Sequence, residues 1–208
     1  MNDAGRVIAG TAKGTRLAAP GEGTRPFGDR VKQTLFAILE PHLRGARILD
    51  LFAGSGAGGI AALSRGAAAA VFVDRDGTAV RVIGENLTRA RVADRGRVIR
   101  AEAISYLADR AAADGPFGIV LIDPPYADPA LLESALARLA APPASRLTAD
   151  AWVVAKHFWR TAPPPVVGLL ASMRTRRFGE TVLTFYRLTV AESPAEQDRT
   201  AETEEEAR

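Results

Sequence analysis

The chain has 208 residues, 47% of them hydrophobic, and no apolar run near the roughly 20 residues of a membrane span, so one cytoplasmic domain with a sizeable core is expected. It has no cysteine and only two histidines, His42 and His157, far apart in sequence, which excludes thiolate chemistry and argues against a histidine-based metal site. Seven acids and two arginines give residues 191–208 a charge of −5. Since the net charge of the chain is +3, residues 1–190 carry a charge of +8, and this basic segment favours a polyanionic partner.

Residues 1–45 are predicted to form a small N-terminal appendage. Residues 6–10 and 16–18 are predicted as a short hairpin around Lys13-Gly14. Asp29 is the predicted N-cap of a helix that runs to Leu39, since apolar residues recur there at helical spacing. The sequence therefore places a hairpin and one helix before the main domain.

Residues 46–190 alternate short apolar runs with helical stretches, which predicts a mostly parallel sheet covered on both faces. Near the end, residues 170–177 and 181–188 predict an antiparallel hairpin, with a short helix over 166–171 as the alternative. This order is typical of the α/β fold of class I methyltransferases, with seven strands. Residues 191–208 are predicted to be a disordered acidic tail. The predicted parallel strands are 47–51, 70–74, 97–100, 118–122 and 151–155, and the helices between and after them are 58–65, 78–91, 104–112 and 129–139.

A glycine-rich loop at residues 50–56 joins the first predicted strand to the next helix. Glycines let the backbone turn tightly and pass close to a ligand, and such loops lie where open α/β sheets bind ligands. Asp74 ends the next strand, where its carboxylate can accept hydrogen bonds from ribose hydroxyls. Glu102 follows the third strand and is expected to face an adenine. The loop thus predicts a nucleoside-containing cofactor.

Two cofactors fit this loop. Gly54, Gly56 and Gly59 also match the G-x-G-x-x-G pattern of dinucleotide-binding proteins, so a nicotinamide dehydrogenase stays an alternative. Asp50 favours S-adenosylmethionine, because an acid is awkward beside a pyrophosphate and useful beside a positive amino group and sulfonium. The residues expected to contact S-adenosylmethionine are Asp50, Phe52, Ala53, Gly54, Ser55, Gly56, Asp74, Arg75, Glu102, Ala103 and Asp123.

The motif Asp123-Pro124-Pro125-Tyr126 follows the most apolar predicted strand. Two prolines restrict the backbone and remove two donors, which leaves carbonyls free to accept. An exocyclic base amine is a poor nucleophile, and two acceptors, the Asp123 carboxylate and the Pro124 carbonyl, direct its lone pair toward the methyl group. Tyr126 is expected to stack on the base, and the sulfonium already activates the methyl group, so no metal is expected. The motif predicts amino methylation of a base.

With these motifs the chain resembles the RsmD family of bacterial methyltransferases, which form N2-methylguanine in the ribosomal RNA of the small subunit. The resemblance runs from about Arg6 to Leu188. It rests on residues 6–10, 24–26, 29–31, 34–36, 50–56, 62–67 and 123–126.

The resemblance implies that the substrate is one guanine of 16S ribosomal RNA, presented in a partly assembled small subunit. The enzyme itself is expected to be a monomer. It also implies that basic residues of the appendage contact this RNA through phosphates, which position without specifying sequence. The DNA amino-methyltransferases and a non-catalytic RNA-binding assembly factor are the alternatives. The expected RNA-binding residues are Arg6, Lys13, Arg16, Arg25, Arg30 and Lys32.

The chain departs from the family after the fifth strand. Lys156 lies where the family often has an acid, so the role of that acid cannot be carried over to this chain. A surface position without a specific role is expected for Lys156 and the following His157, with a phosphate contact as the alternative.

Overall fold

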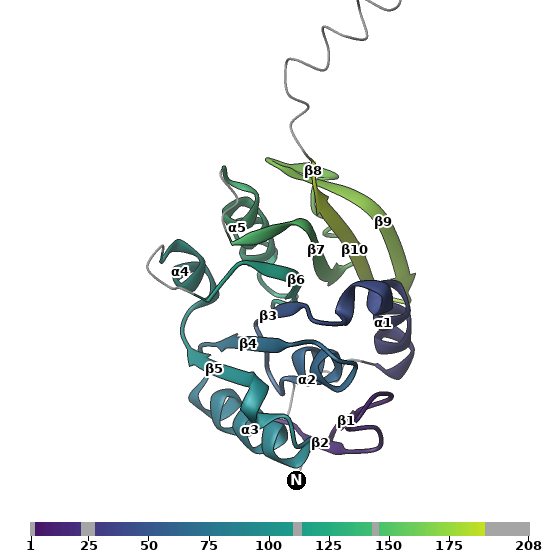
Figure 1. The fold of residues 1–208 in the computed structure, drawn as a ribbon. Helices are drawn as coiled ribbons and strands as arrows, with labels where there is room; N and C mark the ends of the chain where they lie inside the picture. The colour runs from purple at the N-terminus through teal and green to yellow at the C-terminus, as the bar shows by residue number, and fades with distance from the viewer. Residues whose placement is uncertain (1–2, 22–27, 110–113, 143–145, 190–208) are drawn as a thin grey trace, which may run out of the picture.

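An eight-stranded sheet forms the centre of the computed structural model, which describes residues 3–21, 28–109, 114–142 and 146–189 (Figure 1). Its strand order is β5-β4-β3-β6-β7-β10-β9-β8, with parallel pairing from β5 to β7 and antiparallel pairing from there to β8. The predicted class I arrangement is confirmed, and the two-residue β8 adds an edge strand where a short helix was the alternative. The strands are β3 (Arg47–Leu51), β4 (Ala69–Asp74), β5 (Gly96–Arg100), β6 (Phe117–Ile122), β7 (Leu147–Phe158), β8 (Val166–Val167), β9 (Leu170–Phe178) and β10 (Thr181–Leu188).

Helices cover both faces of the sheet, because each buried strand sends alternate side chains to opposite sides. Ile48, Phe72 and Leu121 face the layer of α1, α2 and α3, whereas Leu49 and Val120 face α4 and α5 (Figure 1). None of the helices in the described stretches is long and apolar enough to cross a membrane. The helices are α1 (Asp29–Leu43), α2 (Ala57–Ser64), α3 (Gly77–Arg89), α4 (Ala103–Ala108) and α5 (Pro129–Ala140), with a 3₁₀ turn η1 (Ala93–Arg95) before β5.

The strand order reverses between β3 and β6, which are neighbours in the sheet although the strands β4 and β5 lie between them in sequence. From β3 the chain moves outward through β4 and β5, and from β6 it moves the other way into β7. Open α/β sheets bind ligands outside the carboxyl ends of the strands at such a switch point. The glycine loop after β3 and the Asp123 motif after β6 both lie there.

The N-terminal appendage packs on the α2 and α3 side of the sheet. It consists of β1 (Asp3–Arg6), β2 (Arg16–Ala18) and α1, and its apolar side chains Val7, Leu17 and Leu39 belong to the same buried cluster as the sheet. The hairpin and the helix are present as expected, and α1 continues to Leu43, whose side chain is buried. The described part of the appendage thus shares its core with the main domain.

Two details of the appendage differ from the prediction. Residues 6–10 do not form a strand, because β1 ends at Arg6 and the backbone beyond it binds Ser64 at the end of α2. The Ser64 hydroxyl donates to the Ala9 carbonyl at 2.7 Å, and the Ser64 carbonyl accepts from the Thr11 N–H at 2.8 Å. Asp29 is not the N-cap either: Gly28 holds that position, so Asp29 is the first helical residue.

One buried amide joins the appendage to the glycine loop. Asn86 of α3 is fully buried; its side-chain oxygen accepts from the Ala18 N–H at 2.8 Å, and its NH₂ group donates to the carbonyls of Ala18 and Ser55, each at 2.9 Å. Ala18 lies in β2 and Ser55 in the loop after β3. Asn86 therefore holds two segments that are 37 residues apart in sequence.

Replacing Asn86 by leucine is expected to lower the free energy of unfolding by about 3 kcal/mol, because buried backbone groups of Ala18 and Ser55 lose their partners. Urea denaturation followed by circular dichroism measures this loss. Thr88→Ala, on the exposed side of the same helix, is the control and should change stability by less than about 0.5 kcal/mol. Equal stability of the two variants would show that Asn86 does not clamp these segments.

Candidate active site

The glycine loop after β3 is held in a conformation that few side chains adopt. Gly54 has φ 56° and Gly56 has φ 74°, both in the left-handed region, and Phe52 adopts φ 59° without being glycine. Non-glycine residues in this region are strained, and such strain concentrates at functional sites. Gly59, in the first turn of α2, meets the Phe72 ring so closely that an added Cβ would lie 2.4 Å from it. Because Gly59 has no side chain, α2 packs directly against the Phe72 ring of the sheet.

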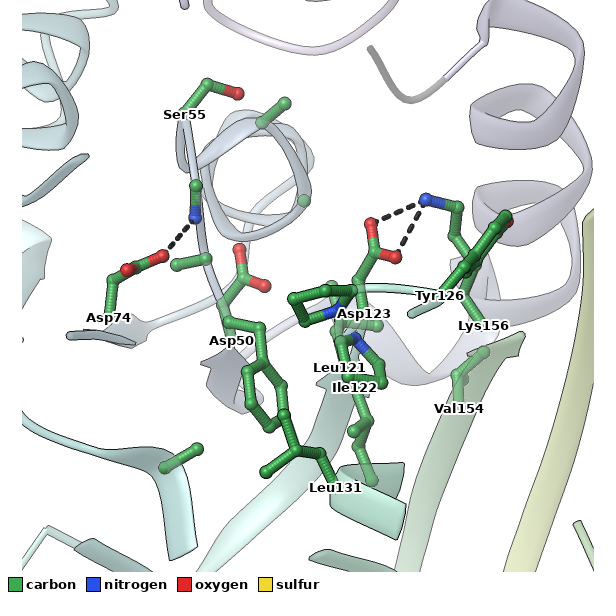
Figure 2. Close-up of a pocket in the computed structure, with 18 of the residues that line it drawn as sticks. Asp50, Ser55, Asp74, Leu121, Ile122, Asp123, Tyr126, Leu131, Val154 and Lys156 are labelled. Carbon is green, nitrogen blue, oxygen red and sulfur yellow. Dashed lines mark hydrogen bonds and ion pairs between the residues drawn. The ribbon is translucent and has the colours of Figure 1, made fainter. Parts of the chain in front are cut away.

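Asp74 fixes the loop from the neighbouring strand. Its carboxylate oxygens accept from the Gly54 N–H at 2.8 Å and from the Asp76 N–H at 2.9 Å, and the Ala53 N–H donates to the Val73 carbonyl at 3.1 Å. Figure 2 shows Asp74 beside the loop, with the Asp50 carboxylate on the other side of the chain. Asp74 thus shapes the loop, and the remaining lone pairs of its carboxylate are available to a ligand.

Asp50 is the buried acid of the loop. It is 5% exposed, and one carboxylate oxygen accepts from the Gly59 N–H at 2.7 Å. Burial, together with the nearby carboxylates of Asp123 and Asp74, raises the pKa of Asp50 to about 7, although the Gly59 hydrogen bond acts against this rise. A positively charged ligand group would be stabilised here, since it would relieve this accumulation of negative charge.

Asp123 follows β6 and forms an ion pair that was not predicted from the sequence. Both of its carboxylate oxygens lie 2.7 Å from the Lys156 ammonium, whose side chain is 11% exposed (Figure 2). Burial raises the pKa of Asp123, and the Lys156 charge and hydrogen bonds act against that rise. The pair therefore sets the protonation state of the carboxylate at the end of β6.

The expectation that Lys156 and His157 occupy the surface without a specific role is wrong. β7 runs from Leu147 to Phe158, beyond the predicted 151–155, so both residues lie inside a strand and are buried. The His157 ring bonds the Thr184 hydroxyl and the Phe158 carbonyl, each at 2.9 Å, and burial lowers its pKa. His157 is thus part of the core between β7 and β10.

Tyr126 closes the other end of the site. Its hydroxyl is 2.9 Å from the Thr181 hydroxyl, and its ring lies 6.2 Å from that of Phe158 and 5.5 Å from the Lys156 ammonium. These contacts hold the Tyr126 ring beside the Asp123–Lys156 pair, as Figure 2 shows.

One cavity of about 920 Å³ joins these groups. Among the described residues it also meets Gly28 and Val31 of the appendage, which the sequence did not suggest. The same holds for Phe158 at the end of β7, Glu180 in the β9–β10 turn and Thr181 at the start of β10. Gly56 was predicted to contact a cofactor but does not line the cavity, because it is buried under Ile83 and caps α2. The predicted residues that do line it are Asp50, Phe52, Ala53, Gly54, Ser55, Asp74, Arg75, Glu102, Ala103, Asp123, Pro124 and Tyr126.

The predicted RNA-binding residues do not all lie on the surface. Arg6, Lys13, Arg16 and Arg30 are exposed. Lys32 is a correction: its side chain is 3% exposed, and its ammonium bonds the Arg6 carbonyl and the Asp29 carboxylate, each at 3.1 Å, so it stabilises the appendage from inside. Arg25 lies outside the described residues.

The fold and the site together define a class of protein. A mostly parallel sheet closed by an antiparallel pair, with the glycine loop and the Asp-Pro-Pro-Tyr motif at its switch point, is the arrangement of class I methyltransferases. A family model described as "Conserved hypothetical protein 95" matches residues 5–187, and the Bacillus subtilis protein YlbH is 38% identical over 183 residues, 88% of this chain and 98% of that one. The chain belongs to this family, the RsmD family.

Other relatives agree with this membership. Ribosomal RNA small subunit methyltransferase D of Escherichia coli is 41% identical over 122 residues, which are 58% of this chain and 60% of that protein. The structure of yhhF from Escherichia coli superposes with a TM-score of 0.77 and 33% identity and covers 88% of this chain and 97% of that one. A Streptococcus mutans protein described as a SAM-dependent methyltransferase shares the fold alone, with a TM-score of 0.62 and 13% identity over 80% of this chain and 50% of that one.

Proposed function

We propose that this chain transfers the methyl group of S-adenosylmethionine to the exocyclic N2 amine of a guanine in 16S ribosomal RNA, with a partly assembled small subunit as substrate. The observation that carries the proposal is the single cavity with two chemically different ends. The glycine loop and Asp50 lie at one end, and Asp123, Lys156 and Tyr126 lie at the other. Ribosomal RNA as the substrate class comes from the relatives that bear the name small subunit methyltransferase D.

The residues around the cavity fit S-adenosylmethionine. Asp74 and Glu102 are acceptors suited to ribose and adenine, Asp50 suits a positive amino group, and about 920 Å³ suffices for the cofactor together with a base. Glu102 is oriented by Arg75, whose guanidinium lies 3.6 Å from its carboxylate. When bound, the cofactor supplies an electrophilic methyl group on a sulfonium.

The chain's own groups then prepare the amine. Lys156 stabilises the charged form of Asp123, so the carboxylate accepts a hydrogen bond from the amine instead of donating one. The Pro124 carbonyl is the second acceptor, and the two together direct the nitrogen lone pair. The Tyr126 ring, held by Thr181 and Phe158, orients the base by stacking. Entry of the base requires its removal from any helical stack, which costs less in an RNA loop.

The test is methylation of small-subunit particles, of deproteinised 16S RNA and of DNA, all from cells that lack this protein, followed by mass spectrometry of the nucleosides. One N2-methylguanosine per particle is the expected product. Methylated adenine or cytosine in DNA would support the DNA amino-methyltransferase instead. Binding of RNA with no methyl transfer at all would support a non-catalytic assembly factor.

Affinity for S-adenosylmethionine is expected to rise roughly tenfold from pH 5.5 to 7, because Asp50, with its pKa near 7 in the free protein, must release a proton as it meets the positive end of the cofactor. The direction follows from linkage: the complex binds fewer protons than the free protein, so higher pH favours it. Calorimetry in two buffers of different ionisation enthalpy measures both the affinity and the released proton.

Asp50→Asn is the matched control for this titration, since its side chain keeps the same shape and an acceptor for the Gly59 N–H. Its cofactor affinity should be lower and nearly independent of pH. A wild-type affinity that is the same at pH 5.5 and 7 would contradict the placement of Asp50 beside the charged end of the cofactor.

A further inference from the structure

A tryptophan-centred cluster of arginines lies beside the base end of the cavity. Trp159 directly follows β7, and its backbone N–H donates to the Glu180 carbonyl in the β9–β10 turn at 3.0 Å. Phe158, Glu180 and Thr181 all line the cavity. The cluster therefore lies at the same end of the sheet as the Asp123 motif, the end where β6 and β7 finish. It does not include the groups already assigned to catalysis.

An aromatic path connects the cavity with this cluster. The Tyr126 and Phe158 ring centroids are 6.2 Å apart, and those of Phe158 and Trp159 are 6.1 Å apart. Tyr126 and Phe158 are partly buried, whereas Trp159 is 36% exposed. Successive rings thus lead from the place proposed for the target base to the protein surface, and nucleic-acid bases stack on rings of this type.

Two arginines are held against the Trp159 ring. The guanidinium carbon of Arg177 is 4.3 Å from the ring centroid and that of Arg160 is 4.7 Å from it. The Arg177 Nε also donates to the Gly179 carbonyl at 2.9 Å, and Arg176 beside it in β9 is exposed. Arginines ordered on a ring keep their charge and lose less side-chain entropy when they bind phosphate.

We propose that Trp159, Arg160 and Arg177 form a second RNA-binding surface, which holds the phosphates and an unpaired base next to the methylated guanine. The proposal rests on the proposed function for the identity of the nucleic acid. The cluster lies near the β9 edge of the sheet, and β1 and β2 lie near α3 toward the other edge (Figure 1). Together with the exposed arginines of the appendage it flanks the cavity, so the RNA strand is held on both sides of the nucleotide that enters.

The test compares RNA binding by the double variant Arg160→Glu/Arg177→Glu with binding by the control variant Arg44→Glu/Arg138→Glu. The two control arginines are exposed and lie at the opposite end of the sheet, where the parallel strands begin. The probe is a labelled single-stranded fragment of 16S RNA, titrated without cofactor at several salt concentrations. The first pair is expected to weaken binding at least tenfold relative to the control pair and to reduce the slope of log K against log salt by about 1 to 2. Equal RNA affinity of the two double variants would overturn the proposal.

Further variants separate stacking from charge. Trp159→Ala should weaken RNA binding, and Trp159→Phe should retain most of the wild-type affinity. Thermal denaturation is used to check that both variants are folded. Cofactor affinity and the transfer rate at saturating RNA should stay near those of the wild type in the arginine variants, because neither arginine lines the cavity. A fall in kcat with unchanged RNA affinity would contradict the RNA-binding role.

The two proposals fail in different ways. If the wild-type protein binds RNA through this cluster but methylates none, the proposed function is wrong and the surface stands. If it methylates RNA while the Arg160→Glu/Arg177→Glu variant binds as the control pair does, the function stands and the surface is wrong.

Discussion

Replacing Asp123 by asparagine is expected to lower the rate of methyl transfer by at least about 10³-fold, because the base amine loses the charged acceptor that directs its lone pair. Affinity for S-adenosylmethionine should change by less than about fivefold, since the acids at the cofactor end, Asp50 and Asp74, are untouched. Single-turnover methylation measures the rate, and calorimetry measures cofactor affinity.

The ion pair requires a second variant in that experiment. Asp123→Asn removes the carboxylate charge opposite the buried Lys156 ammonium, and removing one member of a buried ion pair is strongly destabilising. Asp123→Asn/Lys156→Met removes both charges, so its stability should return toward that of the wild type while transfer stays absent. Recovery of transfer in the double variant, or transfer that survives in the single one, would show that Asp123 is not the acceptor.

Replacing Lys156 by methionine is expected to lower kcat/KM about 10- to 100-fold at pH 6.5 and to shift the rising limb of the pH profile to higher pH. Burial already raises the pKa of Asp123, and Lys156 opposes that rise. Without the ammonium the pKa rises further, so Asp123 becomes the required carboxylate only at higher pH. The measurement is kcat/KM from pH 5.5 to 9.

Lys156→Arg is the matched control, because it keeps the positive charge opposite Asp123. Its pH profile should lie close to that of the wild type, even if geometry lowers the rate. A role of Lys156 in packing alone would lower the rate of the methionine variant equally at every pH, and that result would exclude the electrostatic role.

The sequence predicted the sheet well because its strands are short apolar runs with distinct ends. β3 and β10 match the predicted ranges, and the antiparallel hairpin is confirmed. β7 was predicted too short at both ends, and its carboxyl end was placed three residues too early because Lys156 and His157 interrupt the apolar pattern. That error removed Lys156 from the predicted site. Ile122, the last residue of β6, pairs with Ala155 of β7, so Asp123 and Lys156 are the residues that follow this pair on the two segments.

Lys32 shows a second limit of sequence reasoning. A lysine near the start of an amphipathic helix is ordinarily a solvated charge. Here the strand residue Gly5, which has no side chain, leaves room for the Lys32 ammonium, and an added Cβ would lie 3.2 Å from it. The Arg6 carbonyl then accepts its hydrogen bond. Such a site depends on the tertiary packing of β1 against α1, which local sequence does not encode.

The charges that line the cavity decide what enters it. Within the described residues five carboxylates face this space against two cations, Arg75 and Lys156, although residues 1–190 as a whole are basic. A phosphate is repelled from such an interior, whereas a neutral base and a cationic cofactor are accepted. The polynucleotide backbone must then stay at the rim while a single nucleobase passes inward. In free guanosine monophosphate the phosphate would have to enter the cavity together with the base. Free guanosine monophosphate is therefore expected to compete poorly with RNA as an inhibitor.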